Sequence, residues 1–168
     1  MTKDELKQRL IEAYSHAYQN LGYSSLMGKM VGLLLISPEA LSLDQISEEL
    51  KMSKGPISQI ARRLKDHKLI EKEWVPGERK DFYRAAEDIF GQAFRNYTSS
   101  MRQNRKLGER FAALSEEDSV SDLSVGYFNM RMKEMKAFYG LMDDYHRQFL
   151  KAWEQERTSF LEAKNQDS

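Results

Sequence analysis

Apolar residues recur at three- and four-residue intervals through most of the chain, which predicts a mainly helical fold. The first periodic segment opens with Thr2 and Glu5, which have the spacing of a capping box, and it ends before Gly22. A second segment, 25–36, has almost no polar face, so we expect a helix that is buried on nearly all sides. Its two glycines, four residues apart, would let another helix pack closely.

The pattern changes in the middle of the chain. Ser42 opens a short amphipathic helix with another capping box, and a further helix begins a few residues after that one ends, at Lys54. The segment 70–75 then has the character of a strand, Pro76-Gly77 marks a turn, and 81–85 returns as a second strand. A helix, a tight turn, a helix and a two-stranded hairpin together predict a winged helix-turn-helix.

From Ala86 the periodicity is helical again, interrupted by a loop expected at 115–122. The last segment carries two apolar series at seven-residue spacing, and such a seam requires a partner. We expect a second copy of the chain to cover it, with folding back onto its own domain as the alternative. The two series are Phe128, Met135, Met142 and Phe149, and Tyr139, His146, Trp153 and Phe160.

Charge is distributed unevenly along a chain whose formal net charge is zero. Residues 51–85 hold ten Lys or Arg and five Asp or Glu, whereas 39–50 hold four acidic residues and no basic one. A basic segment within a neutral protein indicates a local surface for an anionic partner.

The helix that begins at Lys54 explains this basic character. At about 100° per residue, its apolar residues gather on one face, and polar, small and basic residues fall on the other. Ser53 is a natural N-cap, and a proline in the first turn costs little there. The outer face can hydrogen-bond base edges and phosphates, with Arg79 and Lys80 on the expected wing. Candidate DNA contacts on and before this helix are Ser53, Lys54, Gly55, Ser58, Gln59, Arg62 and Arg63.

The segment from Gly32 to Ala85 resembles the GbsR branch of the MarR-like transcriptional regulators, most clearly in "SKGPISQ" and "GERKDFYRA". The resemblance covers about a third of the chain. It implies that the outer face of the second helix enters the major groove and that the wing carries Arg79 and Lys80. It also implies a homodimer, formed through the N- and C-terminal helices, on a pseudo-palindromic operator in double-stranded DNA.

Some members of that family sense quaternary ammonium compounds through an aromatic box near the junction of the DNA-binding domain and the dimerisation helices. Phe90, Phe94 and Tyr97 lie at about that place in the sequence, and an aromatic cage suits a methylated cation. The alternative is that these rings are ordinary core residues.

We therefore expect a mainly α fold with a small β-hairpin wing, a winged helix-turn-helix domain plus long dimerisation helices. The predicted parts are an N-terminal packing and dimerisation helix at 1–24, a DNA-binding domain at 25–86 and a C-terminal helical dimerisation region at 87–168. The predicted function is sequence-specific transcriptional regulation, as a repressor. A winged-helix protein–protein adaptor without sequence-specific DNA binding is the main alternative, and an RNA-binding winged helix is another.

The sequence offers little for catalysis or metal binding. It has no cysteine, and it lacks a phosphate-binding glycine loop, a metalloprotease motif and a nucleophile elbow. Asp143, Asp144 and His146 come nearest to a metal cluster, and we interpret them as ordinary solvated residues. We expect no enzyme activity, cofactor or metal, no membrane segment, and a soluble, cytoplasmic protein.

Overall fold

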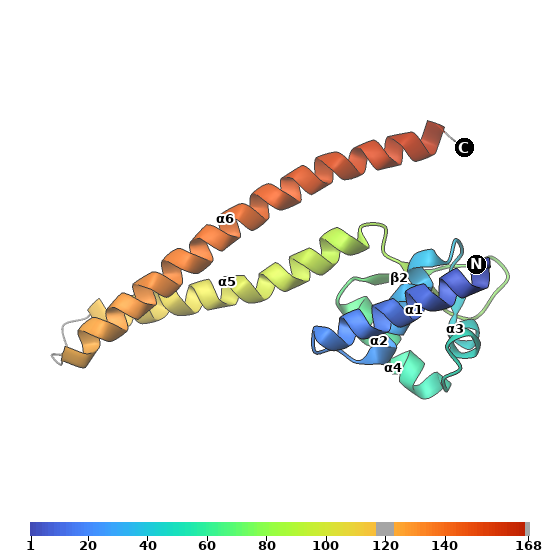
Figure 1. The fold of residues 1–168 in the computed structure, drawn as a ribbon, viewed down its shortest axis with the longest axis horizontal. Helices are drawn as coiled ribbons and strands as arrows, with labels where there is room; N and C mark the ends of the chain where they lie inside the picture. The colour runs from blue at the N-terminus through green and yellow to red at the C-terminus, as the bar shows by residue number, and fades with distance from the viewer. Residues whose placement is uncertain (117–122, 167–168) are drawn as a thin grey trace. The chain divides into compact units, whose positions relative to one another are not determined.

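The computed structural model describes residues 1–116 and 123–166 of the chain. The chain divides into two compact units, Met1–Gln92 and Ala93–Ser168. The first holds the short helices and the sheet, and the second consists of long helices (Figure 1). Most of the expected loop at 115–122 lies outside the described residues.

Two helices, α1 (Lys3–Asn20) and α2 (Ser25–Ile36), pack against each other in the first unit. The capping box of α1 is confirmed, since Glu5 N donates to Thr2 Oγ1 at 3.1 Å and Thr2 N donates to Glu5 Oε2 at 2.8 Å. A Cβ atom at Gly28 would overlap the carbonyl group of Tyr14 on α1. The prediction that glycines in 25–36 serve close helix packing is confirmed, as is the burial of α2.

The helix-turn-helix consists of α3 (Leu43–Leu50) and α4 (Lys54–Asp66). The second capping box is also confirmed, with Gln45 N donating to Ser42 Oγ at 3.3 Å. Between the helices, Lys51 adopts a φ of 52°, which ends α3 and turns the chain into α4. One apolar core joins these helices to α1, α2 and the sheet, and its fully buried members include Ile11, Met30, Leu33, Leu34, Ile46, Ile57, Leu64 and Ile70.

The sheet has three antiparallel strands, in the order β1-β3-β2. β2 (Ile70–Glu73) and β3 (Phe82–Ala85) form the expected hairpin, with Ile70 opposite Ala85, although both strands are shorter than predicted. The third strand, β1 (Leu41–Ser42), pairs with the other edge of β3 and was not predicted. Two residues are too few to show an alternating pattern, so only tertiary pairing reveals β1.

The second unit is built from α5 (Ile89–Glu116), whose first four residues belong to the first unit, and α6 (Leu123–Gln166). The two helices run antiparallel (Figure 1). The rings of Phe111 and Phe128 meet at one end, with centroids 6.3 Å apart, and those of Phe94 and Phe149 meet further along, at 4.7 Å. Part of the predicted seam of α6 therefore packs on α5, while Phe149 and Phe160 remain more than half exposed.

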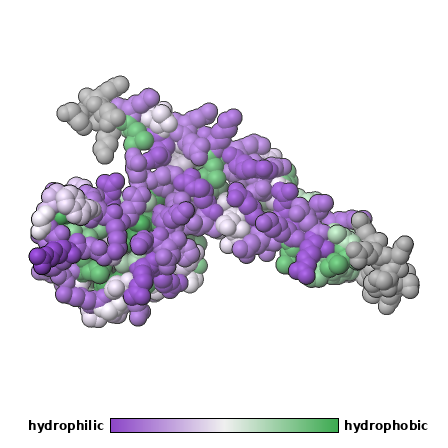
Figure 2. Space-filling view, turned by 180° about the vertical axis from the view of Figure 1, so that it is seen from behind, coloured by the Kyte–Doolittle hydropathy of each residue, from purple (hydrophilic) through white to green (hydrophobic). Residues whose placement is uncertain are grey.

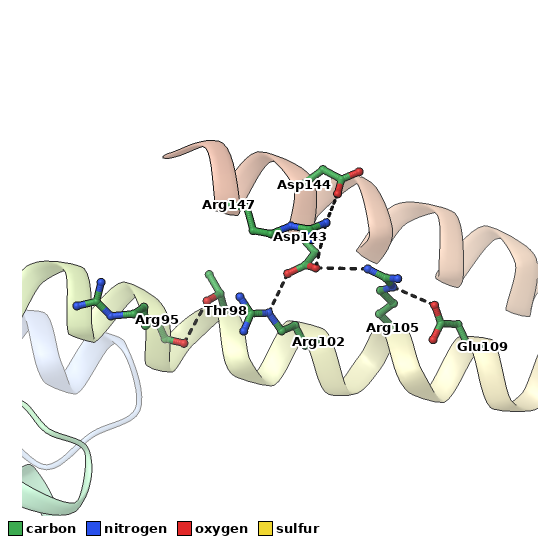
Figure 3. A network of polar contacts seen from close by, with 8 residues as sticks. All are labelled: Arg95, Thr98, Arg102, Arg105, Glu109, Asp143, Asp144 and Arg147. Carbon is green, nitrogen blue, oxygen red and sulfur yellow. Dashed lines mark hydrogen bonds and ion pairs between the residues drawn. The ribbon is translucent and has the colours of Figure 1, made fainter. Parts of the chain in front are cut away.

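A polar network ties α5 to α6 in the middle of their contact (Figure 3). Arg102 Nε donates to Asp143 Oδ1 at 2.9 Å, Arg105 Nη1 donates to Asp143 Oδ2 at 3.3 Å, and Arg147 lies 3.6 Å from the same oxygen. Asp143 is only 7% exposed, so the interpretation of this residue as solvated is wrong. Its two α5 partners are 41 and 38 residues away, beyond the reach of any local pattern.

A different line of apolar side chains on α6 faces solvent. Tyr127, Phe138 and Tyr145 are 67%, 58% and 63% exposed, and their spacing of eleven and seven residues places them along one side of the helix. Met130 and Leu141 extend the same surface and are also more than half exposed. We call these five residues the α6 stripe. Figure 2 shows hydrophobic residues reaching the molecular surface in separate patches among hydrophilic ones.

Among the helices in the described part of the chain, none is both long and apolar enough to cross a membrane.

Candidate nucleic-acid interface

α4 has a buried face and an exposed face, as its periodicity predicts. Ile57 and Leu64 are fully buried against the core of the first unit. Ser53 occupies the N-cap with an extended backbone, but its hydroxyl makes no capping hydrogen bond. That hydroxyl and the first N–H groups of α4 therefore remain available to an external acceptor at the positive end of the helix dipole.

The candidate contact residues of α4 lie on the surface of the first unit. At Gly55, an added Cβ atom would meet no atom within 4 Å, so the backbone can be approached directly. A bulky anion such as a phosphate diester requires this access at a helix N-terminus. Ser58 is half-buried, and the exposed candidates are Ser53, Lys54, Gly55, Gln59, Arg62 and Arg63.

The wing presents its two candidate residues to solvent. Glu78 N donates to Val75 O at 3.1 Å and Gly77 has a φ of 84°, a value that suits glycine and makes the tight turn possible. The following residues, Arg79 and Lys80, are both exposed. The hairpin thus presents two positively charged side chains at its end.

A carboxylate links the wing to the start of α4. Asp44, at the beginning of α3, forms an ion pair with Lys54 through Oδ1 and accepts a hydrogen bond from Lys80 Nζ through Oδ2 at 2.8 Å. The hydrogen bond from Lys54, and then that from Lys80, lowers the pKa of Asp44 to about 2. Asp44 is therefore ionised at neutral pH, next to two of the candidate DNA contacts.

Sequence reasoning missed Asp44, because an acidic residue in the first turn of a helix is common without any ligand. Lys80 is 36 residues away, so no local spacing signals the pair. It also missed Trp74, which directly follows β2 and is 78% exposed. A tryptophan this exposed beside a wing is an unusual surface feature, and it could have been noticed from its place next to Pro76-Gly77.

Two of the three candidate effector residues, Phe94 and Tyr97, lie against His146 in the second unit, with its ring centroid 5.1 Å and 6.2 Å from theirs. Phe90 belongs to the first unit and is 56% exposed. The quaternary ammonium effector stays a prediction.

A surface hollow of about 530 Å³ in the second unit is lined mainly by charged side chains of α5 and α6, none of them a candidate effector residue. Within the described residues, no group of three or more His, Asp or Glu is placed to hold a metal ion. Asp143 and His146 instead contact arginines and aromatic rings, respectively.

The sequence is similar to curated regulators along most of its length, although no family model matches it. It is 26% identical over 149 residues to the HTH-type transcriptional repressor OpcR of Bacillus subtilis (strain 168), which covers 83% of this chain and 80% of the relative. It is 23% identical over 141 residues to the putative HTH-type transcriptional regulator YvaV of the same organism, covering 79% of each chain. The chain resembles helix-turn-helix transcriptional regulators over about four-fifths of its length.

A solved structure shares the fold. The crystal structure of a transcriptional regulator aligns with 89% of this chain and 98% of its own, with a TM-score of 0.73 and 22% sequence identity. The shared architecture includes the long helices as well as the winged helix-turn-helix. Together with the curated relatives, it supports a DNA-binding transcription regulator.

Proposed function

We propose that the protein is a transcriptional repressor of the GbsR branch of the MarR-like regulators, which binds a pseudo-palindromic operator as a homodimer. The observation that carries this proposal is the exposed face of α4. Gln59 and Arg62 extend from a helix whose opposite face is fixed in the core by Ile57 and Leu64. A rigid helix with amide and guanidinium groups on its free side can read base edges in a major groove.

The start of α4 and the wing supply the contacts to the DNA backbone. Ser53, Lys54 and Gly55 offer a hydroxyl, a cation and an open backbone at the positive end of the helix. Arg79 and Lys80 offer two more cations on the wing. Phosphate contacts of this kind fix the register of the protein on the duplex, while α4 distinguishes the sequence.

The α6 stripe supports a dimer. Exposed aromatic and aliphatic side chains that α5 leaves uncovered are typical of an interface between subunits. A two-fold axis through such an interface would place two copies of α4 about one DNA turn apart, which matches an operator with two half-sites.

The test is a binding titration by fluorescence anisotropy. Duplexes from upstream of the protein's own gene and its neighbours are compared with random duplex over a range of salt concentrations. A specific regulator should bind one natural duplex at least about a thousandfold more tightly than random DNA. Equal, salt-sensitive binding to all duplexes would leave only a basic surface, as the adaptor alternative expects.

Variants assign the binding to α4. Gln59→Ala and Arg62→Ala should each cost about 1–3 kcal/mol of specific binding and relax discrimination at the base they contact. Lys106→Ala, which removes an exposed charge from α5, is the matched control and should leave specificity intact. If the α4 variants keep full sequence specificity, the residues that recognise the DNA bases lie outside this face of α4.

A further inference from the structure

Asp44 lies at the meeting point of three elements of the winged helix-turn-helix. It belongs to the first turn of α3, Lys54 is the first residue of α4, and Lys80 is on the wing. Each lysine contacts a different oxygen of the carboxylate, and the Lys80 contact measures 2.8 Å. One negative charge is thereby shared between two cations that are 26 residues apart in sequence.

Both lysines are open to an external anion. Their side chains are 68% and 61% exposed, compared with 38% for the carboxylate. Ion pairs with this much solvent around them contribute little net free energy, so a phosphate can replace the carboxylate at small cost. The pairs therefore compete with DNA for the lysines without preventing binding.

Competition of this kind acts unequally on the two modes of DNA binding. Binding to random duplex depends almost entirely on cations neutralising phosphates, whereas specific binding also draws on base contacts. Gln59 and Arg62, the candidate base-reading residues, have no contact with Asp44 among those the structure records. The Asp44 carboxylate should therefore weaken binding to random duplex proportionally more than it weakens specific binding.

We propose that Asp44 is a specificity-determining residue, which competes with DNA phosphates for Lys54 and Lys80 and so restrains sequence-independent binding. This inference rests on the proposed function, because it assumes that the two lysines face the DNA backbone. It differs from a simple positioning role for the carboxylate. If Asp44 only held the wing in place, its loss would weaken all DNA binding.

The test compares Asp44→Asn with Glu49→Gln on random duplex across a salt series. Glu49 is the matched control, since it lies on the same helix, loses the same charge and pairs with Lys7 of α1, which is not a candidate DNA contact. Asp44→Asn should bind random duplex about 3- to 10-fold more tightly than wild type, the effect of one screened charge at close range. The slope of the logarithm of affinity against the logarithm of salt concentration should steepen by about one for each lysine that gains a contact with a DNA phosphate.

Glu49→Gln should leave both the affinity and the slope near the wild-type values. Thermal melting shows whether each variant is folded. Random-duplex binding by folded Asp44→Asn that equals or falls below that of Glu49→Gln overturns the proposal, because the carboxylate then positions the lysines or has no effect. If Asp44→Asn proves unstable, Asp44→Ser, which keeps a side chain that can hydrogen-bond at the helix start, provides the same comparison.

A second set of variants asks whether the effect passes through the lysines. In a Lys54→Gln/Lys80→Gln background, adding Asp44→Asn should change random-duplex affinity by less than twofold. An undiminished gain would indicate a long-range charge effect and would contradict the proposal.

The failure of this inference is distinguishable from failure of the proposed function. A wild-type protein that prefers no natural duplex refutes the function, yet the comparison of Asp44→Asn with Glu49→Gln on random DNA still decides the role of Asp44. A wild-type protein that binds no duplex even at low salt refutes both.

Discussion

Arg102 on α5 donates from Nε to Oδ1 of Asp143 on α6, across 2.9 Å, and joins two helices that are otherwise held mainly by side-chain packing. Asp143 is among the few charged side chains buried in the described part of the chain. The contact is compatible with one register of α6 against α5, as are the ring contacts on either side of it.

Replacing Asp143 with Asn should lower the free energy of unfolding by about 1–2 kcal/mol, since charge-assisted hydrogen bonds are lost while the arginine ends stay partly hydrated. Chemical denaturation of Asp143→Asn measures this change. Asp144→Asn is the control, as its side chain is 58% exposed, and its effect should stay within about 0.5 kcal/mol. Equal effects of the two variants would contradict a special role for Asp143.

The same carboxylate should make stability depend on acid. The hydrogen bond from Arg102 is the main cause that lowers the pKa of Asp143 in the folded protein. A lowered folded-state pKa gives a contribution that is fully present above the unfolded pKa of about 4 and is lost as pH falls through the folded value. Thermal melts from pH 7 downwards should show a steeper loss below about pH 4 for wild type than for Asp143→Asn. Parallel curves would show that Asp143 is not responsible.

Gly28→Ala should destabilise the first unit. The new Cβ atom would overlap the backbone of Tyr14, and overpacking of this kind costs about 1–3 kcal/mol, more than the gain in helix propensity. Gly140→Ala is the control, because nothing lies within 4 Å of its added Cβ atom on α6, and it should raise stability by about 0.5–1 kcal/mol. Denaturation midpoints of the two variants should therefore move in opposite directions.

The α6 stripe should mediate self-association. Tyr145→Glu places a charge among the exposed rings of the stripe, and it should weaken dimerisation by about 2 kcal/mol or more. Analytical ultracentrifugation over a concentration series measures the change, with Thr158→Glu, an exposed position on a different side of α6 from Tyr145, as the control. A wild-type protein that stays monomeric at all concentrations would refute the proposed dimer.

Trp74 should report DNA binding. Its indole is 78% exposed beside the wing, so contact between the wing and a duplex should shift its fluorescence emission to shorter wavelength. The chain's other tryptophan, Trp153, lies in the second unit and provides the background signal. Trp74→Phe should remove the shift on adding duplex while leaving that background. A shift that persists in Trp74→Phe would place the change elsewhere.

Local rules were sufficient for most of the fold. Thr2 and Ser42 could be identified as helix starts because a capping box is written within four residues, and α4 could be placed because its apolar positions recur every three or four residues. The same periodicity placed most of the candidate DNA contacts of α4 on its exposed side, although whether they touch DNA stays a prediction.

Pairing between distant residues could not be inferred in the same way. β1 depends on the edge of β3 some forty residues later, and Asp143 depends on arginines of another helix. The apolar seam of α6 was recognised, but nothing in its spacing says whether α5 or a second subunit covers it. Sequence periodicity predicts that a surface will be buried, but it does not identify the element or subunit that buries it.

At Gly28 the backbones of α1 and α2 touch, so neither helix can slide along the other without losing the contact. α2 in turn packs on α4. A change at this single point of contact therefore disturbs the packing of the whole first unit, because α1, α2 and α4 share one apolar core.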